Sequence, residues 1–135
     1  MAFTQLIYLA SDTILIAEEH VLLIKRKNEP FKGMWAFPGG FVDEGEDLPN
    51  AAARELLEET SVAINPERLT QFKTYGKPGR DPRFHTVSVV YAVHVNEKPE
   101  AIAADDAAEV AWFNLSKLPK MAFDHKAILE EYLLF

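Results

Sequence analysis

Three glutamates beside an arginine form the segment of this chain best suited to chemistry. Glu55, Glu58 and Glu59 share an arc of about 100° if the segment is helical, because successive helical residues turn by about 100°. Carboxylates this close repel one another, which raises the pKa of at least one unless a cation lies between them. Since Mg²⁺ and Mn²⁺ prefer carboxylate oxygens, this face is predicted to bind a divalent metal, with Arg54 orienting a neighbouring carboxylate. The alternative is an ordinary solvated acidic helix face.

The residues before and within this helix predict how the glutamates are presented. Residues 28–45 contain two prolines and four glycines, including Gly39-Gly40, and are therefore expected to be mostly loop and turn. Asp47 is a suitable N-cap, and Pro49 is tolerated in a first helical turn. The expected core stripe is Ala53, Leu56, Leu57 and Thr60. This stripe predicts that the glutamates point away from the hydrophobic interior.

The remaining elements follow from hydrophobic patterning. The expected strands are Leu6–Ala17 and Val21–Lys25, which form a hairpin, then Leu69–Tyr75, Phe84–Val95 and Val110–Phe113. Gly76–Pro82 and Ala101–Glu109 are expected loops, and Ala122–Leu134 is an expected closing helix. Strands on both sides of an early helix, with another helix at the end, predict an α/β or α+β sandwich. Residues 1–135 are expected to form one domain.

Composition narrows the class of protein. The net charge of −7 argues against an electrostatic nucleic-acid surface. The absence of cysteine excludes disulfides and thiolate chemistry and suits a cytoplasmic protein. No apolar run approaches the roughly 20 residues of a membrane helix, and no basic stretch precedes the apolar start as in a signal peptide. The four histidines have no metal-ligand spacing and are assigned no role.

The three glutamates belong to a longer pattern of charged residues and glycine at fixed spacing. Gly40 is followed after five residues by Glu46, and after seven more by Arg54-Glu55-Leu56, one residue, Glu58-Glu59 and then the apolar Val62. At every charged position this matches the Nudix box, so the chain resembles the Nudix hydrolase family over nearly its whole length. Ser61 stands where that family usually has glycine. Because glycine suits a left-handed helix cap, the serine is expected to cost about 1 kcal/mol.

The resemblance implies a Nudix-type α/β/α sandwich with a mixed central sheet that binds Mg²⁺ or Mn²⁺ and hydrolyses a nucleoside diphosphate linkage. It also implies roles for particular residues. Glu55, Glu58 and Glu59 would be metal ligands, with a carbonyl near Gly39 or Gly40 completing the shell. Arg54 would orient the glutamates and Glu46 would support them. The general base stays open between a box glutamate and a loop acid among Asp105, Asp106 and Glu109, of which Asp106 is favoured as a metal or water contact.

Two further segments resemble the ADP-ribose pyrophosphatase branch of that family. They are residues 30–35, which lead into residues 38–46, and the loop Gly79-Arg80-Asp81-Pro82-Arg83. Arg80 and Arg83 could hold phosphate or ribose oxygens by forked hydrogen bonds, or belong to an ordinary surface turn. Asp81 could accept from ribose hydroxyls or pair with an arginine. Phe31 and Trp35 could stack on adenine, or be a surface residue and a core residue respectively.

The resemblance leaves competing functions. ADP-ribose hydrolysis would release AMP and ribose 5-phosphate, whereas another Nudix substrate, such as a nucleotide sugar or an oxidised nucleoside triphosphate, would give other products. A non-catalytic ADP-ribose sensor that controls a DNA-binding domain is a third candidate. The intact box acids and a length of 135 residues, which leaves no room for a winged helix, argue against it. The expected partners are a small nucleotide and a second copy of the chain, since members of this branch are commonly homodimers, with no nucleic acid and no membrane.

Overall fold

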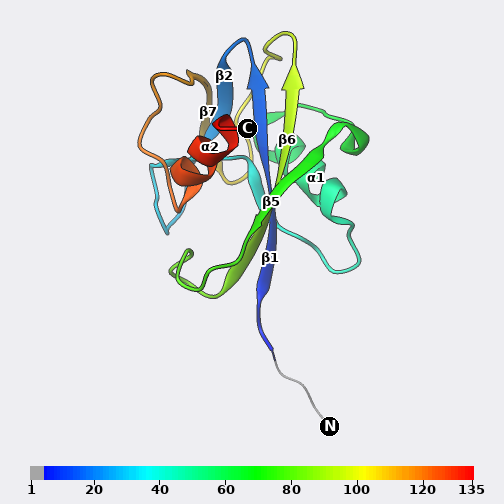
Figure 1. The fold of residues 1–135 in the computed structure, drawn as a ribbon, viewed down its shortest axis with the longest axis vertical. Helices are drawn as coiled ribbons and strands as arrows, with labels where there is room; N and C mark the ends of the chain where they lie inside the picture. Colours follow the sequence, from blue (N-terminus) through cyan, green and yellow to red (C-terminus); the bar gives the residue numbers. More distant parts are fainter. Residues whose placement is uncertain (1–4) are drawn as a thin grey trace.

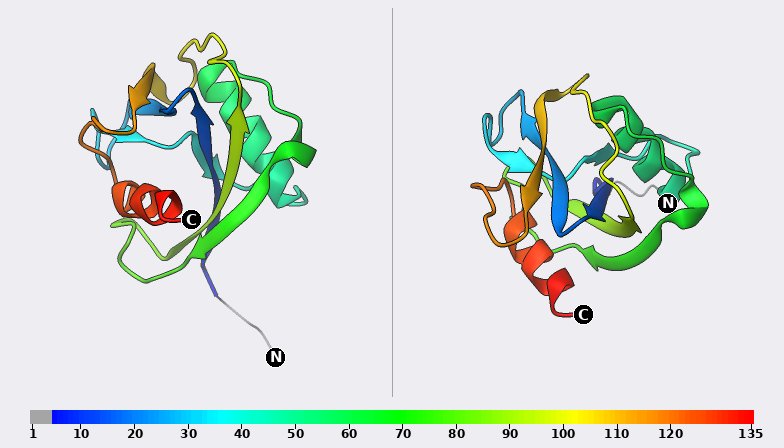
Figure 2. Two further views of the ribbon diagram at one scale, coloured as in Figure 1. Left: turned by 45° about the horizontal axis from the view of Figure 1, so that its top comes forward. Right: turned by 90° about the horizontal axis from the view of Figure 1, so that it is seen from above.

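The computed structural model describes residues 5–135, in which two helices flank a mixed β-sheet (Figure 1). The helices are α1 (Leu48–Thr60) and α2 (His125–Leu133), with a short 3-10 helix, η1 (Pro66–Arg68). The strands are β1 (Tyr8–Ala17), β2 (His20–Arg26), β3 (Trp35–Ala36), β4 (Gly39–Phe41), β5 (Thr70–Tyr75), β6 (Thr86–Val95) and β7 (Ala107–Asn114). Figure 2 shows α1 and α2 on opposite sides of the sheet. The predicted α/β/α sandwich with a mixed sheet is confirmed.

The predicted hairpin joins β1 and β2, with Ala17 opposite His20. Its turn residues, Glu18 and Glu19, have positive φ angles of 50° and 61°. Two left-handed residues give the turn type whose twist matches that of paired strands, although the sequence lacks the usual Asn-Gly signal. Pairing of the flanking apolar strands therefore imposes a left-handed conformation that the two turn residues do not favour by themselves.

Strand β1 lies at the centre of the sheet and changes partner along one of its edges. It runs parallel to β6 along its full length, from Tyr8 opposite Thr86 to Ala17 opposite Val95. On its other edge it pairs with β4 at Ala10–Asp12 and with β2 at Ile16 and Ala17. The change of partner lies between Asp12 and Ile16.

Alternate residues of β1 supply two separate cores, because successive side chains of a strand point to opposite faces. Ile14 and Ile16 pack with residues of α2, including Ile128. Leu15 packs on the other face with Leu22 of β2 and Leu56 of α1. By the same alternation, the side chain of Asp12 lies on the α2 side of the sheet.

Helix α1 begins as predicted, but its buried face differs from the predicted stripe. The Asp47 carboxylate caps the helix by accepting from the Leu48 N–H at 2.9 Å. Leu57, expected in the core, is 50% exposed, whereas Ala51 and Ala52 are fully buried. Apolar identity alone does not fix the rotation of a helix when small residues permit close packing on a second face. The rotation turns Glu59 inward, so the prediction that all three glutamates point away from the interior is wrong.

Several element boundaries also differ from those predicted. Strand β7 begins at Ala107, inside the expected loop, because it pairs with β2 from Arg26 to His20. Helix α2 begins at His125, three residues later than expected, after Phe123 adopts a left-handed φ of 52°. The short strands β3 and β4 lie in residues expected to be loop. Within residues 5–135, no helix is long and apolar enough to span a membrane.

Ser61 ends α1 in the left-handed conformation predicted for the usual glycine. Its φ is 64°, and its N–H donates to the Leu57 carbonyl at 2.9 Å. Ser61→Gly should therefore stabilise the fold by about 0.5 kcal/mol, since glycine pays no Cβ penalty there and loses only the exposed hydroxyl bond to the Ile102 carbonyl. Urea unfolding would measure it. Ser116→Gly is the matched control, since Ser116 is exposed and lacks a positive φ, and it should not stabilise the protein.

Candidate active site

A cavity of about 380 Å³ lies where the partner change of β1, the start of α2 and residues of α1 meet. This volume falls within the range of small-molecule sites. The acidic side chains that line it include Asp12 of β1, Glu55 and Glu59 of α1, and Asp106 before β7. Arg26, Arg80 and Arg83 line it as well. Acidic and basic groups therefore share one concave surface, as binding of a cation together with an anionic ligand requires.

Glu59 is the most deeply buried of the predicted metal ligands, with 4% exposure. Its carboxylate accepts a hydrogen bond from the Gly39 N–H at 2.8 Å. Burial raises the pKa of Glu59 to about 8, and repulsion from Glu55, Asp12 and Asp106 adds to the effect against the opposing hydrogen bond. A carboxylate in this position either holds a proton near neutral pH or requires a cation beside it.

The Gly39-Gly40 pair allows two carboxylates to approach the backbone closely. A Cβ on Gly40 would lie 2.7 Å from the carboxyl carbon of Glu55. A Cβ on Gly39 would overlap the carboxylate of Asp12. Burial also raises the pKa of Glu55, although Arg54 opposes that shift. The glycines are therefore required by the packing of acids against β4 rather than by a left-handed backbone.

Arg54 links the acids of the box, as the resemblance implied. Its guanidinium donates to Glu46 at 2.7 and 2.9 Å, to Glu55 at 2.9 Å and to Glu58 at 3.3 Å. It also donates to the Phe41 carbonyl at 3.1 Å. The hydrogen bonds from Arg54 lower the pKa of Glu46. The arginine thus fixes one side of α1 against β4 and keeps Glu46 ionised.

The donor chemistry of these residues fits a hard divalent cation. Glu55, Glu59, Asp106 and the Gly40 backbone lie on the cavity wall, and crowding of buried carboxylates is what a cation would relieve. Glu58 is exposed, pairs with Arg54 and does not line the cavity. Among residues 5–135, no three acidic or histidine side chains already converge in a ligand geometry. Binding a metal would therefore require side-chain rotation, chiefly of Glu58.

In the loop between β5 and β6, Asp81 pairs with an arginine, as one alternative predicted, whereas Arg80 is used differently from the prediction. The Arg80 side chain is only 6% exposed, and its forked contact is made with Asp124, at 2.8 and 2.9 Å, rather than with solvent. Asp81 is buried and accepts from the backbone and side chain of Arg83. Although burial opposes it, hydrogen bonding to Arg83 holds the pKa of Asp81 below its usual range. The surface-turn alternative for Arg80 is wrong, because its guanidinium is an internal support of the cavity wall.

The two predicted stacking residues are not brought to the cavity. Trp35 packs edge-on against Phe113 with ring centroids 4.7 Å apart, within the core on the α2 side. Phe31 packs against Phe123 at 4.8 Å. Neither lines the cavity, so Trp35 follows its core-packing alternative.

Sequence reasoning missed several cavity residues, among them Asp12, Arg26 and His125. Asp12 has a detectable signal, since it is a charged residue within an apolar strand. Burial raises its pKa to about 7, although Arg80 opposes the shift, and burial lowers the pKa of His125 to about 3. The guanidinium of Arg26 lies 5.0 Å from the centre of the Phe123 ring. Burial, and to a smaller extent repulsion from Arg83, lowers the pKa of Arg26.

Comparison with known proteins identifies the family. The NUDIX domain model matches residues 8–132. The chain belongs to the Nudix family. It is a Nudix pyrophosphohydrolase similar to the ADP-ribose pyrophosphatase of Methanocaldococcus jannaschii, with 45% identity over 92% of this chain and 72% of that protein.

Two other similar proteins carry names that refer to ADP-ribose. It is 37% identical to the ADPR-responsive transcriptional repressor NtrR of Acinetobacter baylyi, over 82% of this chain and 45% of the repressor. A bifunctional NMN adenylyltransferase/ADP-ribose pyrophosphatase from Francisella tularensis, solved with AMP and a Mn ion, superposes with a TM-score of 0.88 at 32% identity. That match covers 98% of this chain and 43% of the Francisella chain, so this chain spans less than half of both proteins.

Proposed function

We propose that this Nudix hydrolase cleaves the diphosphate of ADP-ribose, giving AMP and ribose 5-phosphate, in a metal-dependent reaction. The observation that carries the proposal is that Glu55, Glu59 and Asp106 share a cavity wall with Arg26 and Arg83. Acids suited to a cation thus lie beside guanidinium groups suited to phosphate oxygens. The 45% identity with an ADP-ribose pyrophosphatase supports this substrate over other nucleotides.

The proposed cofactor is Mg²⁺ or Mn²⁺, held by Glu55, Glu58, Glu59 and the Gly40 carbonyl. When bound, the metal supplies positive charge to the diphosphate oxygens and lowers the pKa of a water molecule. The buried, uncompensated carboxylate of Glu59 supports this assignment, as does the Mn ion in the Francisella relative.

The remaining site residues act on the ligands and the attacking water. Arg54 orients Glu55 at the cavity wall, holds Glu58 in the metal-free protein, and is itself fixed by Glu46. Asp106, exposed at the cavity rim, is the proposed additional contact to the attacking water. Arg83, whose guanidinium also lies 5.4 Å from the Phe41 ring centre, is the proposed substrate contact at the mouth, with Asp81 orienting it. Arg80 supports this loop indirectly, through its ion pair with Asp124.

The experiment that tests the proposal is a product analysis. The protein is incubated with ADP-ribose, a nucleotide sugar and an oxidised nucleoside triphosphate in Mg²⁺ or Mn²⁺, and the products are separated. We expect AMP and ribose 5-phosphate from ADP-ribose, and loss of turnover with a chelator, since the metal carries several kcal/mol of transition-state stabilisation. Faster release of a nucleoside monophosphate and pyrophosphate from the triphosphate would instead identify a different Nudix substrate.

The second candidate is a non-catalytic ADP-ribose sensor, favoured by the likeness to NtrR. It predicts tight binding of ADP-ribose without turnover in either metal, whereas the hydrolase predicts turnover. The net charge of −7 argues against direct contact with nucleic acid. The relative is a transcriptional repressor, however, and this favours keeping nucleic acid among the partners to be tested.

We also propose that the protein is a cytoplasmic homodimer. Support for a dimer comes from exposed apolar side chains at the start of β1 and just before it, including Leu6 at 74% and Ile7 at 41% exposure. A contiguous patch of exposed apolar side chains commonly marks a protein–protein interface. The lack of cysteine suits a reducing compartment.

A further inference from the structure

The floor of the cavity carries a buried acid–imidazole pair outside the Nudix box. Asp12 comes from the middle of β1 and His125 from the first turn of α2, with exposures of 6% and 5%. Both residues line the cavity that holds Glu55 and Glu59. Neither has a role in binding the metal as proposed above.

The orientation of His125 is fixed by the backbone. The Phe37 N–H donates to His125 Nδ1 at 3.1 Å, so Nδ1 carries no proton. The ring also stacks on Phe37, with centroids 4.7 Å apart and an interplanar angle of 20°. A neutral imidazole with an acceptor Nδ1 carries its hydrogen on Nε2. That Nε2–H faces Asp12.

The distance between the two groups leaves room for a third polar atom. His125 Nε2 lies 4.0 Å from Asp12 Oδ2, which is too long for a hydrogen bond. The nearby guanidinium of Arg80 is used elsewhere, because it donates to Asp124, Ser88 and the Thr86 carbonyl. An oxygen about 2.8 Å from both Nε2 and Oδ2 would accept from the imidazole and donate to the carboxylate.

A hydroxyl group fits this pair of partners, since it is both a donor and an acceptor. A phosphate oxygen is a poorer match, because it can only accept and therefore repels Asp12 whenever that residue is ionised. We propose that Asp12 and His125 form a hydroxyl-binding subsite that recognises a ribose hydroxyl of the substrate. This inference rests on the proposed function, which supplies a ribose on each side of the diphosphate. It assigns specificity, rather than catalysis, to the two residues.

The test compares ligands that differ by one hydroxyl and cannot be turned over by diphosphate cleavage. Calorimetry in Mg²⁺ measures the affinity of the full chain for ribose 5-phosphate, 2-deoxyribose 5-phosphate, AMP and 2′-deoxy-AMP. The wild type should bind one ribose compound about tenfold or more tightly than its deoxy partner, because the deoxy compound leaves the buried Nε2–H of His125 without an acceptor. Asp12→Asn should reduce that ratio to near one.

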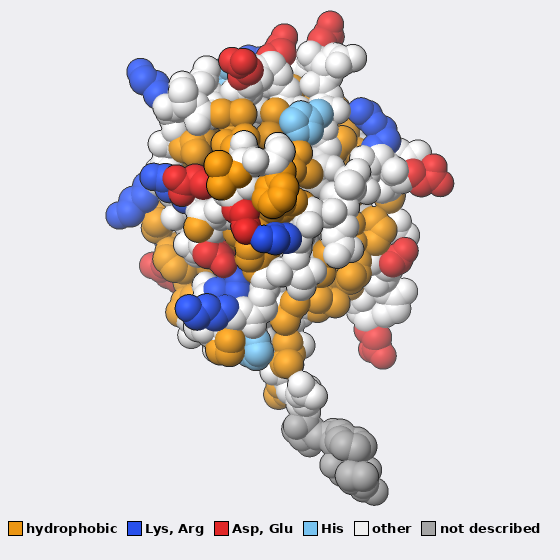
Figure 3. Space-filling view, viewed as in Figure 1, with side chains coloured by type: hydrophobic (Ala, Val, Ile, Leu, Met, Phe, Trp, Pro, Cys, Tyr) orange, Lys and Arg blue, Asp and Glu red, His pale blue; other side chains and the backbone are white. Residues whose placement is uncertain are grey.

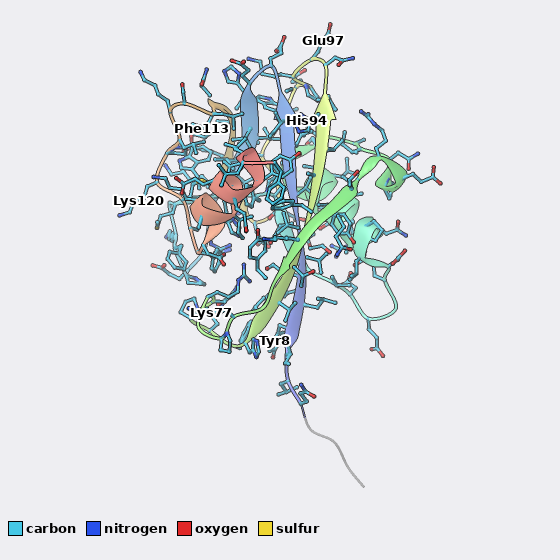
Figure 4. All side chains as sticks on the ribbon, viewed as in Figure 1. Tyr8, Lys77, His94, Glu97, Phe113 and Lys120 are labelled. Carbon is cyan, nitrogen blue, oxygen red and sulfur yellow. The ribbon has the colours of Figure 1, made fainter. Side chains whose placement is uncertain are left out.

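A second variant separates recognition from support of the fold. His125→Asn keeps an oxygen that can accept from the Phe37 N–H but lacks the Nε2 donor, so it should also reduce the ratio while melting close to the wild type. Glu97→Gln is the control, since Glu97 is exposed on the β6–β7 loop, at the end of the molecule opposite Lys77 (Figure 4), and it should leave the ratio unchanged.

The ligand arms identify which ribose is bound. A changed ratio for the ribose phosphates assigns the subsite to the terminal ribose, and a changed ratio for the AMP pair assigns it to the adenosine ribose. Unchanged ratios in both variants, or a wild type that does not discriminate either pair, would overturn the proposal. Failure of ADP-ribose turnover would contradict the proposed function without altering these binding ratios, so the two ideas fail separately.

Discussion

Glu59→Gln should lower ADP-ribose turnover by at least about a hundredfold while the protein stays folded. The proposed metal needs the charge of this carboxylate, and removal of one charged contact to a metal-held transition state costs several kcal/mol. Glutamine retains the oxygen that accepts from the Gly39 N–H, so the contact between α1 and β4 is kept. Glu58→Gln should have an effect of similar size, if Glu58 turns from Arg54 to the metal as proposed. Steady-state kinetics in saturating Mg²⁺ measure both.

The same substitution should alter the pH dependence of stability in the metal-free protein. Because the pKa of Glu59 rises from 4.5 to about 8 on folding, the native state binds more protons than the unfolded state between these values. The free energy of unfolding therefore falls as pH rises through that window. Glu59→Gln should weaken this fall and be more stable than the wild type at pH 9 in chelator. Asp12, with a folded pKa of about 7, should leave a smaller decline.

A suitable control for both measurements is Glu130→Gln, an exposed position on α2 away from the cavity. It should change neither turnover nor the pH dependence. Undiminished turnover in both Glu58→Gln and Glu59→Gln would refute the metal assignment. Loss of turnover together with loss of folding in Glu59→Gln would instead indicate that the carboxylate is needed for the structure alone.

Arg80→Met should destabilise the protein by about 3 kcal/mol. The Arg80 side chain is almost fully buried, and its loss leaves the partly buried Asp124, 31% exposed, without its partner, which is the costly way to break such an ion pair. Ser88 and the Thr86 carbonyl also lose a donor. Because Arg80 ties residues 76–85 to the start of α2, the KM for ADP-ribose should rise as well. Urea unfolding and kinetics below the melting temperature measure the two effects.

The matched control for Arg80→Met is Lys25→Met. Lys25 pairs with Glu109 across β2 and β7 at 3.1 Å, but both side chains are solvated, with exposures of 36% and 60%. Exposed pairs of this kind contribute less than about 1 kcal/mol. Figure 3 shows such acidic and basic side chains interspersed with apolar ones on one face of the molecule. If Arg80→Met and Lys25→Met lower the free energy of unfolding equally, the pair between Arg80 and Asp124 stabilises the protein no more than a surface pair does.

The arrangement of the box acids could be predicted largely from sequence, because it depends on local spacing. Arg54, Glu55, Glu58 and Glu59 lie within two turns of one helix, so their proximity follows from helical geometry. The cap at Asp47 and the strand character of β1, β2 and β6 follow similarly from local patterns. Even here the rotation of α1 was mispredicted, since the burial of Glu59 depends on β4, which lies far from it along the chain.

The sequence by itself determined the family, the mixed sandwich and the acidic face, because spacing, periodicity and capping are properties of neighbouring residues. Only the tertiary structure decided that Asp12, Arg26 and His125 belong to the same cavity, and that Arg80 turns inward to Asp124. Those contacts join residues 44 to 113 positions apart, from Arg80 with Asp124 to Asp12 with His125. The physical reason is that burial and partner choice arise from packing between elements, which no local pattern encodes.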